Sequence, residues 1–268
     1  MDDSRSRTGL LMLNLGCGDR THPDWVNIDS SLRLRLGMLP LIRRWVPSPP
    51  DIRIHDLRHG IPFGDGTVDI VYASHVLEHL TRNVGREFLR EIYRVLKPGG
   101  IVRIVVPDLE AAVRQYLVAL DGVKSHPEDG SLRQVHEWAT IYLLDQMVRT
   151  SPGGDMAPWL REHRDTPVVC AMEGTLRSIA ASPATDPRLL RRLLGRLWPR
   201  SAAKTGELHR WMYDAVALRS LLVATCFGNV ASFSCCESRI AGWESYHLDN
   251  NPDGSPHQPG SIWMEGVK

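Results

Sequence analysis

The chain has little net charge and no long apolar run. Among its 268 residues, 32 Lys and Arg side chains nearly balance 31 Asp and Glu side chains, so the formal net charge is +1. A membrane span needs about 20 consecutive apolar residues, and the first residues, MDDSRSRTG, are polar. We therefore expect no transmembrane segment, and bulk charge gives no argument for nucleic acid as a partner.

Cysteine is scarce and shows no pairing pattern. The five cysteines are Cys17, Cys170, Cys226, Cys235 and Cys236, and none of them forms a C-x-x-C motif. This scatter does not suit a disulfide framework, and it favours a reducing compartment such as the cytoplasm. No internal repeat is visible in the sequence.

A phosphate-binding glycine is also missing from the most informative stretch, LLMLNLGCGDRTHPDWVNIDS at residues 10–30. Its first apolar run ends in Gly16-Cys17-Gly18 and its second ends in Asp29, but Thr21 stands where G-x-G-x-x-G needs its last glycine. Glycines at the carboxyl edge of a strand let a ligand approach the backbone, and an acid after the next strand can bind ribose hydroxyls. The stretch predicts a nucleoside cofactor with a tail smaller than a pyrophosphate.

Strands alternate with helices in the pattern that we derive from apolar runs and turn residues. After the two runs above, the predicted strands are Ile52–Leu57, Val68–Ala73, Ile101–Val106, Ala231–Ile240 and a last edge strand at Ser261–Val267. The clearest amphipathic helices are Arg86–Leu96 and Asp214–Thr225. Strands that alternate with helices indicate an α/β fold with a doubly wound sheet.

Four motifs in the first part of the chain carry a family resemblance. LNLGCG, NID, DLRHGIPFGDGTVDIVYASHVLEHL and LREIYRVLKPGGIVRIVVPD follow one another over roughly the first 110 residues. In this order they resemble the class I S-adenosylmethionine (SAM)-dependent methyltransferases. The resemblance implies a mostly parallel, seven-stranded Rossmann-like sheet with a largely helical insertion before the last strands. The later ELHRWMYD and SIWMEGVK look like a type 11-like bacterial branch associated with sugar or polysaccharide modification.

The resemblance also implies where SAM binds. The loop after the first strand lies against the methionine and ribose, and the acid after the second strand binds the ribose hydroxyls; these residues are Gly16, Cys17, Gly18 and Asp29. Positions after the third strand contact adenine, and positions after the fourth face the methionine end; these are Asp56, Leu57, Ser74 and His75. One departure stands out. Ten residues separate Gly18 from Asp29, which predicts a shortened or irregular crossover in place of a full helix.

A second group of candidates lies in SHVLEHL, residues 74–80. If this segment opens a helix, His75, Glu78 and His79 share one face, and a distant His209 completes a set suited to a divalent metal. The set resembles the metal-binding E-x-x-E-H plus distant His of small-RNA 2′-O-methyltransferases and of a ubiquinone-biosynthesis O-methyltransferase, with His75 in place of the first acid. It implies an ion such as Mg²⁺ that activates and aims an acceptor hydroxyl.

Alternatives remain open for these histidines and for several later residues. His79 or His209 can serve as a general base without metal, or the Glu78–His79 pair is only structural while His75 lines the cofactor pocket. Asp108 orients a hydroxyl, binds a metal or caps the following helix. Residues 211–214 form a wall for a sugar ring or belong to the core. The basic, apolar stretches 32–46 and 189–197 lie on a membrane surface or pack on the body.

The sequence thus predicts a cytoplasmic O-methyltransferase that acts on a hydroxyl of a sugar or glycan-like small molecule. Its candidate catalytic residues are His79, His209 and Asp108. We expect a SAM-binding core at 1–108, a helical insertion or lid over the acceptor site at 109–210, and completion of the sheet by 211–268.

Other functions and partners stay open at this stage. One alternative is N- or O-methylation of a non-sugar natural product, and another is a SAM-binding partner subunit without turnover. Besides the acceptor, we expect no nucleic acid and no transmembrane segment. Peripheral membrane contact and a homodimer remain alternatives.

Overall fold

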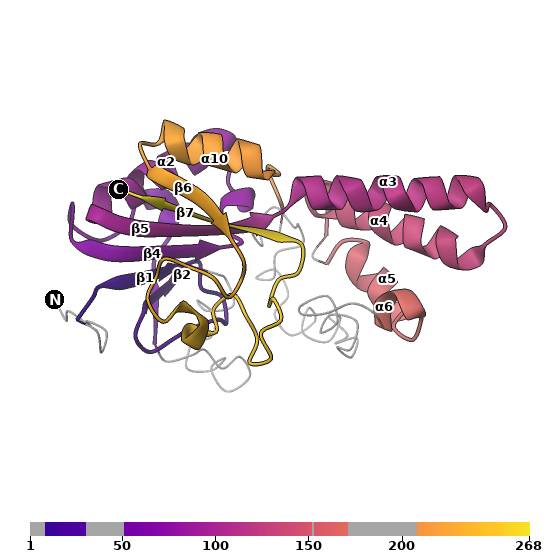
Figure 1. Ribbon diagram of the computed structural model, residues 1–268, viewed down its shortest axis with the longest axis horizontal. Helices are drawn as coiled ribbons and strands as arrows, with labels where there is room; N and C mark the ends of the chain where they lie inside the picture. The colour runs from indigo at the N-terminus through magenta and orange to yellow at the C-terminus, as the bar shows by residue number, and fades with distance from the viewer. Residues whose placement is uncertain (1–8, 31–50, 152, 171–207) are drawn as a thin grey trace, which may run out of the picture. The chain divides into compact units, whose positions relative to one another are not determined.

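The computed structural model of the protein describes residues 9–30, 51–151, 153–170 and 208–268 (Figure 1). The chain divides into two compact units. The first unit contains residues 1–108, 210–256 and 261–268, and the second contains residues 109–209 and 257–260. The predicted basic, apolar stretches at 32–46 and 189–197 lie outside the described residues.

The first unit is built on a seven-stranded sheet with the strand order β3-β2-β1-β4-β5-β7-β6. The strands are β1 (Met12–Leu15), β2 (Val26–Asp29), β3 (Ile52–Ile54), β4 (Val68–Ser74), β5 (Leu96–Pro107), β6 (Gly228–Phe233) and β7 (Ser261–Val267). Strands β1 to β5 pair in parallel, and β7 runs antiparallel to both β5 and β6. The α/β fold with a mostly parallel, seven-stranded sheet is therefore confirmed.

Several predicted strands differ from the observed ones. Strand β3 ends at Ile54 and not at Leu57, and β5 is longer than the predicted Ile101–Val106. Strand β6 ends at Phe233, so the prediction that it continues to Ile240 is wrong; residues after Phe233 turn away and contribute backbone carbonyls to a buried arginine. Strand β7 has the predicted bounds but is not at the edge, because it lies between β5 and β6. Its nearly continuous burial fits this inner position.

The crossover from β1 to β2 contains no helix, as the short spacing predicted. Two buried asparagines organise it instead. The Asn14 side chain donates to the carbonyl of Arg20 at 2.8 Å and to Oδ1 of Asn27 at 3.0 Å. Asn27 in turn donates to the carbonyls of His22 and Trp25, both at 3.0 Å. These side chains satisfy backbone groups that a helix would pair internally.

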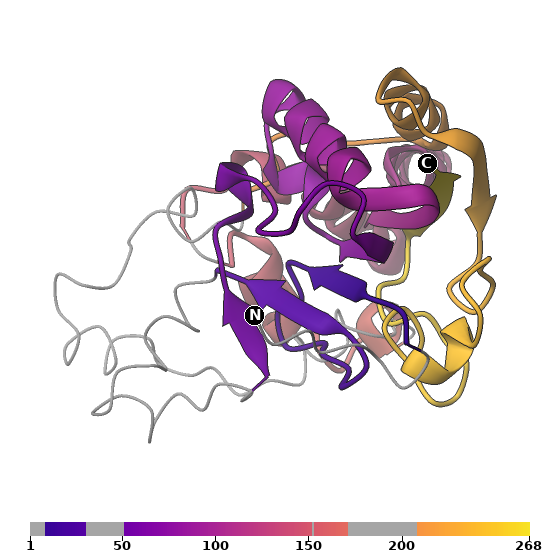
Figure 2. The same ribbon diagram turned by 90° about the vertical axis from the view of Figure 1, so that its left-hand side faces the viewer.

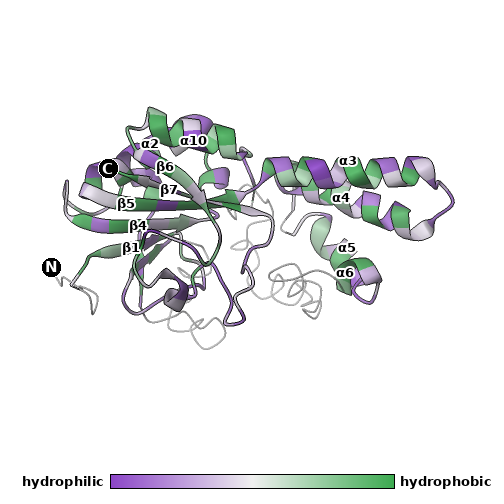
Figure 3. Cartoon of the chain, in the orientation of Figure 1, coloured by the Kyte–Doolittle hydropathy of each residue, from purple (hydrophilic) through white to green (hydrophobic). Residues whose placement is uncertain are grey.

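Helices cover one face of the sheet in the first unit. The amphipathic helix α2 (Arg82–Val95) buries Phe88, Leu89, Ile92 and Val95. Helix α10 (Ala215–Ala224) lies on the same side, as Figures 1 and 2 show, and buries Leu218 and Leu222 in the same apolar cluster. The strands of this core are mostly hydrophobic in Figure 3. Asp214 caps α10 by accepting the N–H of Ala217 at 2.7 Å.

An aromatic cluster covers the opposite face of the sheet. Trp243, from the short 3-10 helix η4 (Trp243–Tyr246), packs near Trp25 and Tyr72, with ring centroids 6.1 and 5.1 Å apart. Met12, Val105 and Leu248 belong to the same cluster. Segment 234–256 thus replaces a second helical layer on this side of the first unit (Figures 1 and 2).

A fully buried arginine lies under this segment. Arg103 on β5 donates to the carboxylates of Asp249 and Glu265 at 2.7 and 2.8 Å and to the carbonyls of Ser234 and Glu237 at 2.8 and 2.9 Å. Its guanidinium also stacks over the Trp243 ring, with 4.5 Å to the centroid. Arg103 therefore joins β5, β7 and segment 234–256 through one charged centre.

The partners of Arg103 follow from strand register. Tyr72 on β4 and Glu265 on β7 are the residues paired with Arg103 on the two neighbouring strands. The Tyr72 hydroxyl donates to Asp249 at 2.5 Å. Burial raises the pKa of Asp249 above its usual value, although the charge of Arg103 opposes this effect. A buried carboxylate in such a place is tolerable because charged and hydrogen-bonding partners surround it.

The second unit is helical. Helices α3 (Leu109–Ser125) and α4 (Gly130–Val148) pack against each other, and the shorter α5 (Met156–Glu162) and α6 (Pro167–Cys170) follow. Trp138, Trp159 and Leu160 lie at the centre of its apolar cluster. Residues 109–149, the first part of the predicted helical insertion at 109–210, are mostly helical. Within the described part of the chain, no helix is both long and apolar enough to cross a membrane.

We predict that Arg103→Met strongly destabilises the protein. The substitution keeps much of the side-chain volume but leaves Asp249 and Glu265 buried without a countercharge, which costs about 3–5 kcal/mol. The measurement is urea unfolding followed by circular dichroism. The control is Arg90→Gln, which breaks an exposed ion pair with Glu87 and should change the free energy of unfolding by less than about 1 kcal/mol. Equal effects of the two substitutions would contradict the prediction.

Candidate functional site

The candidate site lies where the strand order of the sheet reverses. Strands β1 and β4 are neighbours, while the chain continues from β1 outward to β2 and β3 and from β4 in the other direction. Ligands of open parallel sheets bind at the carboxyl ends of strands at such a reversal, because the connecting segments diverge there. The loop after β1 and the tip of β4 are therefore adjacent in the first unit, as the sequence-based site requires.

The loop after β1 depends on two glycines. Gly16 and Gly18 have φ angles of +67° and +54°, in the left-handed region that favours glycine. A Cβ on Gly16 would overlap Cγ2 of Val76, which follows β4. The N–H groups of Gly16 and Cys17 both donate to the carbonyl of Ile28, at 2.7 and 3.2 Å. The loop consequently turns tightly over β2 and approaches the end of β4 closely.

Asp29 connects this loop to the ends of β2 and β3. Its carboxylate accepts the N–H of Gly18 at 2.9 Å, and its backbone carbonyl accepts the N–H of His55 at 3.1 Å. The side chain is mostly buried yet lies at the strand tip. The two oxygens of a carboxylate can accept hydrogen bonds from both hydroxyls of a ribose.

Cys17 is buried between the two glycines. Burial, with a smaller contribution from the negative charge of Asp29, raises the pKa of the Cys17 thiol to about 12. The thiol is therefore protonated at neutral pH and is a poor nucleophile. We assign Cys17 a packing role in the loop.

Asp56 and Leu57 lie just after β3, at the start of the 3-10 helix η1 (Leu57–His59). The Asp56 carboxylate accepts two hydrogen bonds from the Arg58 guanidinium, at 2.9 and 2.7 Å, and these hold its pKa well below the usual value. It also accepts the backbone N–H of Arg58 at 3.1 Å. Asp56 is therefore ionised and can accept a hydrogen bond from an exocyclic amino group such as that of adenine.

The tip of β4 holds a side-chain arrangement that the sequence did not predict. His75 has a φ of +54°, which is unusual for a residue with a Cβ. Its Nδ1 lies 3.0 Å from Oε1 of the fully buried Glu78, and its Nε2 lies 3.1 Å from Oγ of Ser261 at the start of β7. Ser74 ends β4 directly before it. No sequence signal pointed to Ser261, because 186 residues separate it from His75.

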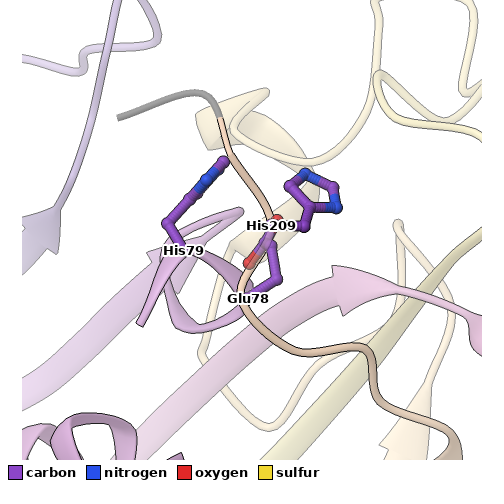
Figure 4. A group of neighbouring side chains, drawn as sticks. All are labelled: Glu78, His79 and His209. Atoms are coloured by element: carbon purple, nitrogen blue, oxygen red, sulfur yellow. The ribbon is translucent and has the colours of Figure 1, made fainter. Parts of the chain in front are cut away.

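Residues 74–80 do not form the single helix on which the shared face depended. Between β4 and α2 there is only the 3-10 helix η2 (Leu77–His79), and His75 precedes it in a left-handed conformation. The side chains of Glu78, His79 and His209 nevertheless gather (Figure 4), with one possible ligand atom of each within 4.8 Å of the others. His209 directly precedes Arg210 in the chain, and the backbone N–H of Arg210 donates to the carbonyl of Glu78 at 2.7 Å.

The chemistry of this donor set can be tested against the predicted metal. Mg²⁺ prefers a nearly complete shell of oxygen ligands, whereas two of these three residues offer imidazole nitrogens. His75 is not part of the group, and its Nδ1 lies beside the Glu78 carboxylate that a cation would need. The residues present therefore do not fit Mg²⁺, and we derive no step through a metal.

The remaining candidates are Asp108 and residues 211–214, and they differ in how far they are buried. Asp108 forms a parallel β-bridge with Tyr213 directly before α3. Tyr213 is buried, and burial together with the charge of Glu78 raises the pKa of its hydroxyl to about 12. Trp211 by contrast is 39% exposed, and its backbone N–H donates to the carbonyl of Glu78 at 3.2 Å. Residues 211–214 were predicted to form a wall for a sugar ring or to belong to the core. Tyr213 belongs to the core, whereas Trp211 lies on the surface beside the site.

We predict that Gly16→Ala weakens SAM binding by at least about tenfold, because a Cβ would displace Val76 and strain the left-handed loop. The measurement is calorimetric titration with SAM. Gly66→Ala is the matched control: Gly66 has a similar φ of +62° but open space around its Cβ position. Adding Val76→Ala to Gly16→Ala should restore part of the affinity. Normal SAM binding by Gly16→Ala would contradict this account of the loop.

Comparison with known proteins finds a likeness to methyltransferases. Residues 13–104 match the family described as "Methyltransferase domain". An uncharacterized methyltransferase, sll0829, of Synechocystis sp. is 29% identical over 99 residues, which cover 36% of this chain and 47% of that protein. A Mycolicibacterium smegmatis protein, named a probable S-adenosylmethionine-dependent methyltransferase, is 39% identical over 57 residues, covering 20% of this chain and 21% of its own. The alignments thus span less than half of either relative.

Solved structures give only a loose likeness. A SAM-dependent methyltransferase from Archaeoglobus fulgidus is 11% identical, and the match covers 97% of this chain and 86% of that one with a TM-score of 0.41. A score this low carries no argument about function. These comparisons show a likeness to methyltransferases, including SAM-dependent ones, over the first part of the chain.

Proposed function

We propose that the protein is an enzyme that binds SAM across the carboxyl ends of β1, β2 and β4 and transfers its methyl group. The observation that carries this proposal is the loop of Gly16, Cys17 and Gly18, which is left-handed at both glycines and held by the Gly18–Asp29 hydrogen bond. A backbone without Cβ atoms lets the ligand approach closely, and the carboxylate beside it binds the ribose hydroxyls. Asp56, at the end of β3, is placed for the adenine amino group.

The methyl group then lies toward the tip of β4, beside Ser74 and His75. The acceptor oxygen attacks the methyl carbon in line with the sulfur, so that the new C–O bond forms as the C–S bond breaks. The products are a methyl ether and S-adenosylhomocysteine. Alignment of the three atoms supplies much of the rate, because it turns a bimolecular step into an effectively unimolecular one.

The hydroxyl proton has to leave during this step. We assign the role of proton acceptor to His79, next to Glu78 in η2. His209 and Asp108 are the other candidate catalytic residues. Imidazole is the side chain that accepts a proton near neutral pH. Asp108, at the end of β5, orients the acceptor hydroxyl in this proposal.

We further propose a sugar or glycan-like acceptor. Support comes from Trp211, which is exposed and whose backbone N–H bonds the carbonyl of Glu78, since aromatic faces stack well on sugar rings. The resemblance of ELHRWMYD, which contains Trp211, to a sugar-modifying branch points the same way.

The test is methyl transfer from labelled SAM to a panel of glycosides, together with SAM titrations of wild type and Asp29→Asn. We expect Asp29→Asn to bind SAM about 10–100-fold more weakly, because a charged acceptor of hydrogen bonds is lost. Asp65→Asn is the control: it removes an exposed carboxylate before the amino end of β4, at the edge of the sheet away from the site.

The outcomes distinguish O-methylation of a sugar from the alternative functions. Transfer to a glycoside that Asp29→Asn abolishes supports the proposal. Tight SAM binding without transfer to any acceptor would favour a non-catalytic partner subunit, and transfer only to amines would favour N-methylation. Unchanged SAM affinity in Asp29→Asn would overturn the assigned cofactor site.

A further inference from the structure

Arg82 and Trp211 form an exposed cationic platform in the first unit. The Arg82 guanidinium lies over the Trp211 ring, with 4.7 Å from Cζ to the centroid. Arg82 is the first residue of α2, and Trp211 is 39% exposed. The platform adjoins the candidate site, because the backbone N–H of Trp211 donates to the carbonyl of Glu78, four residues after the end of β4.

Of the four arginines on α2, Arg90 and Arg94 form ion pairs with carboxylates, whereas Arg82 and Arg86 form none within the described residues. Arg82 differs from Arg86 in its stacking on Trp211. Arg90 pairs with Glu87 at 2.6 Å, and Arg94 pairs with Glu91 and Asp65 at 2.9 and 2.6 Å. The first turn of α2 contains no acidic residue. The positive charge of the exposed Arg82 guanidinium is thus accessible to a ligand.

Guanidinium and indole recognise different parts of one ligand. The planar guanidinium offers a fork of N–H donors that matches a carboxylate or a phosphate. The indole offers a flat apolar face for a ring, and stacking with Arg82 fixes the orientation of both side chains. A ligand that uses the whole platform therefore needs a ring with an anionic group attached.

We propose that Arg82 and Trp211 select an acceptor that is an acidic sugar, a ring bearing a carboxylate or a phosphate. The inference rests on the proposed function and narrows its acceptor class. Trp211 contacts the ring, and Arg82 pairs with the anion. Both residues bind the substrate and take no part in the proton transfer.

The test compares binding of three small sugars to the full chain in the presence of S-adenosylhomocysteine: methyl glucoside, methyl glucuronide and glucose 6-phosphate. We expect at least one anionic sugar to bind about tenfold more tightly than the neutral glucoside, since a bidentate charged pair is added. The two anionic sugars also distinguish a carboxylate from a phosphate. Binding measured by calorimetry needs no turnover, so the result does not depend on finding the natural acceptor.

Three variants assign the effect to the platform. Arg82→Gln should abolish the preference for the anionic sugars, and Trp211→Leu should weaken binding of all three. Arg90→Gln, an exposed arginine on the same helix, should leave both properties unchanged. Thermal unfolding of each variant checks that the fold is retained.

The outcomes also distinguish this inference from the proposed function. If the wild type does not bind S-adenosylhomocysteine, the proposed function fails. If it does bind S-adenosylhomocysteine, this inference is overturned by any of three results: no binding of the three sugars, equal binding of neutral and anionic sugars, or a preference that survives in Arg82→Gln.

Discussion

The buried charge of Arg103 is the constraint on which the rest of the first unit depends. A guanidinium without solvent exposure has to be neutralised and hydrogen-bonded on all sides. Its partners come from β7 through Glu265, from segment 234–256 through Asp249 and two carbonyls, and from the Trp243 ring. These contacts therefore fix the last part of the chain on the sheet.

This arrangement also reaches the candidate site. Arg103 and Glu265 are paired in the register of β5 with β7, and the same register brings Ser261 opposite Pro107 at the carboxyl end of β5. There Ser261 meets His75, which Glu78 contacts from the other side. A slip of β7 by one residue would turn Glu265 away from Arg103 and Ser261 away from His75. Strand β7 thus connects the buried charge of Arg103 with the candidate site at His75.

Local sequence signals predicted the elements that depend on local chemistry. The glycines after β1, the acid after β2 and the periodicity of α2 identified the loop and the parallel core, because backbone freedom and hydrophobic pattern act over a few residues. The bounds of β7 were also predicted, but its place inside the sheet was not. Arg103 sits in the apolar run IVRIVV, and nothing near it in sequence shows that Asp249 and Glu265 will neutralise it.

The sequence by itself determined an α/β sheet and predicted a nucleoside site over Gly16, Gly18 and Asp29, since these features need only strand ends and residue types. The tertiary structure decided the pairing of His75 with Glu78 and Ser261, and the stacking of Arg82 on Trp211. These contacts join residues up to 186 positions apart. Their partners are chosen by strand register and by the burial of charge, which are properties of the folded chain and not of any local segment.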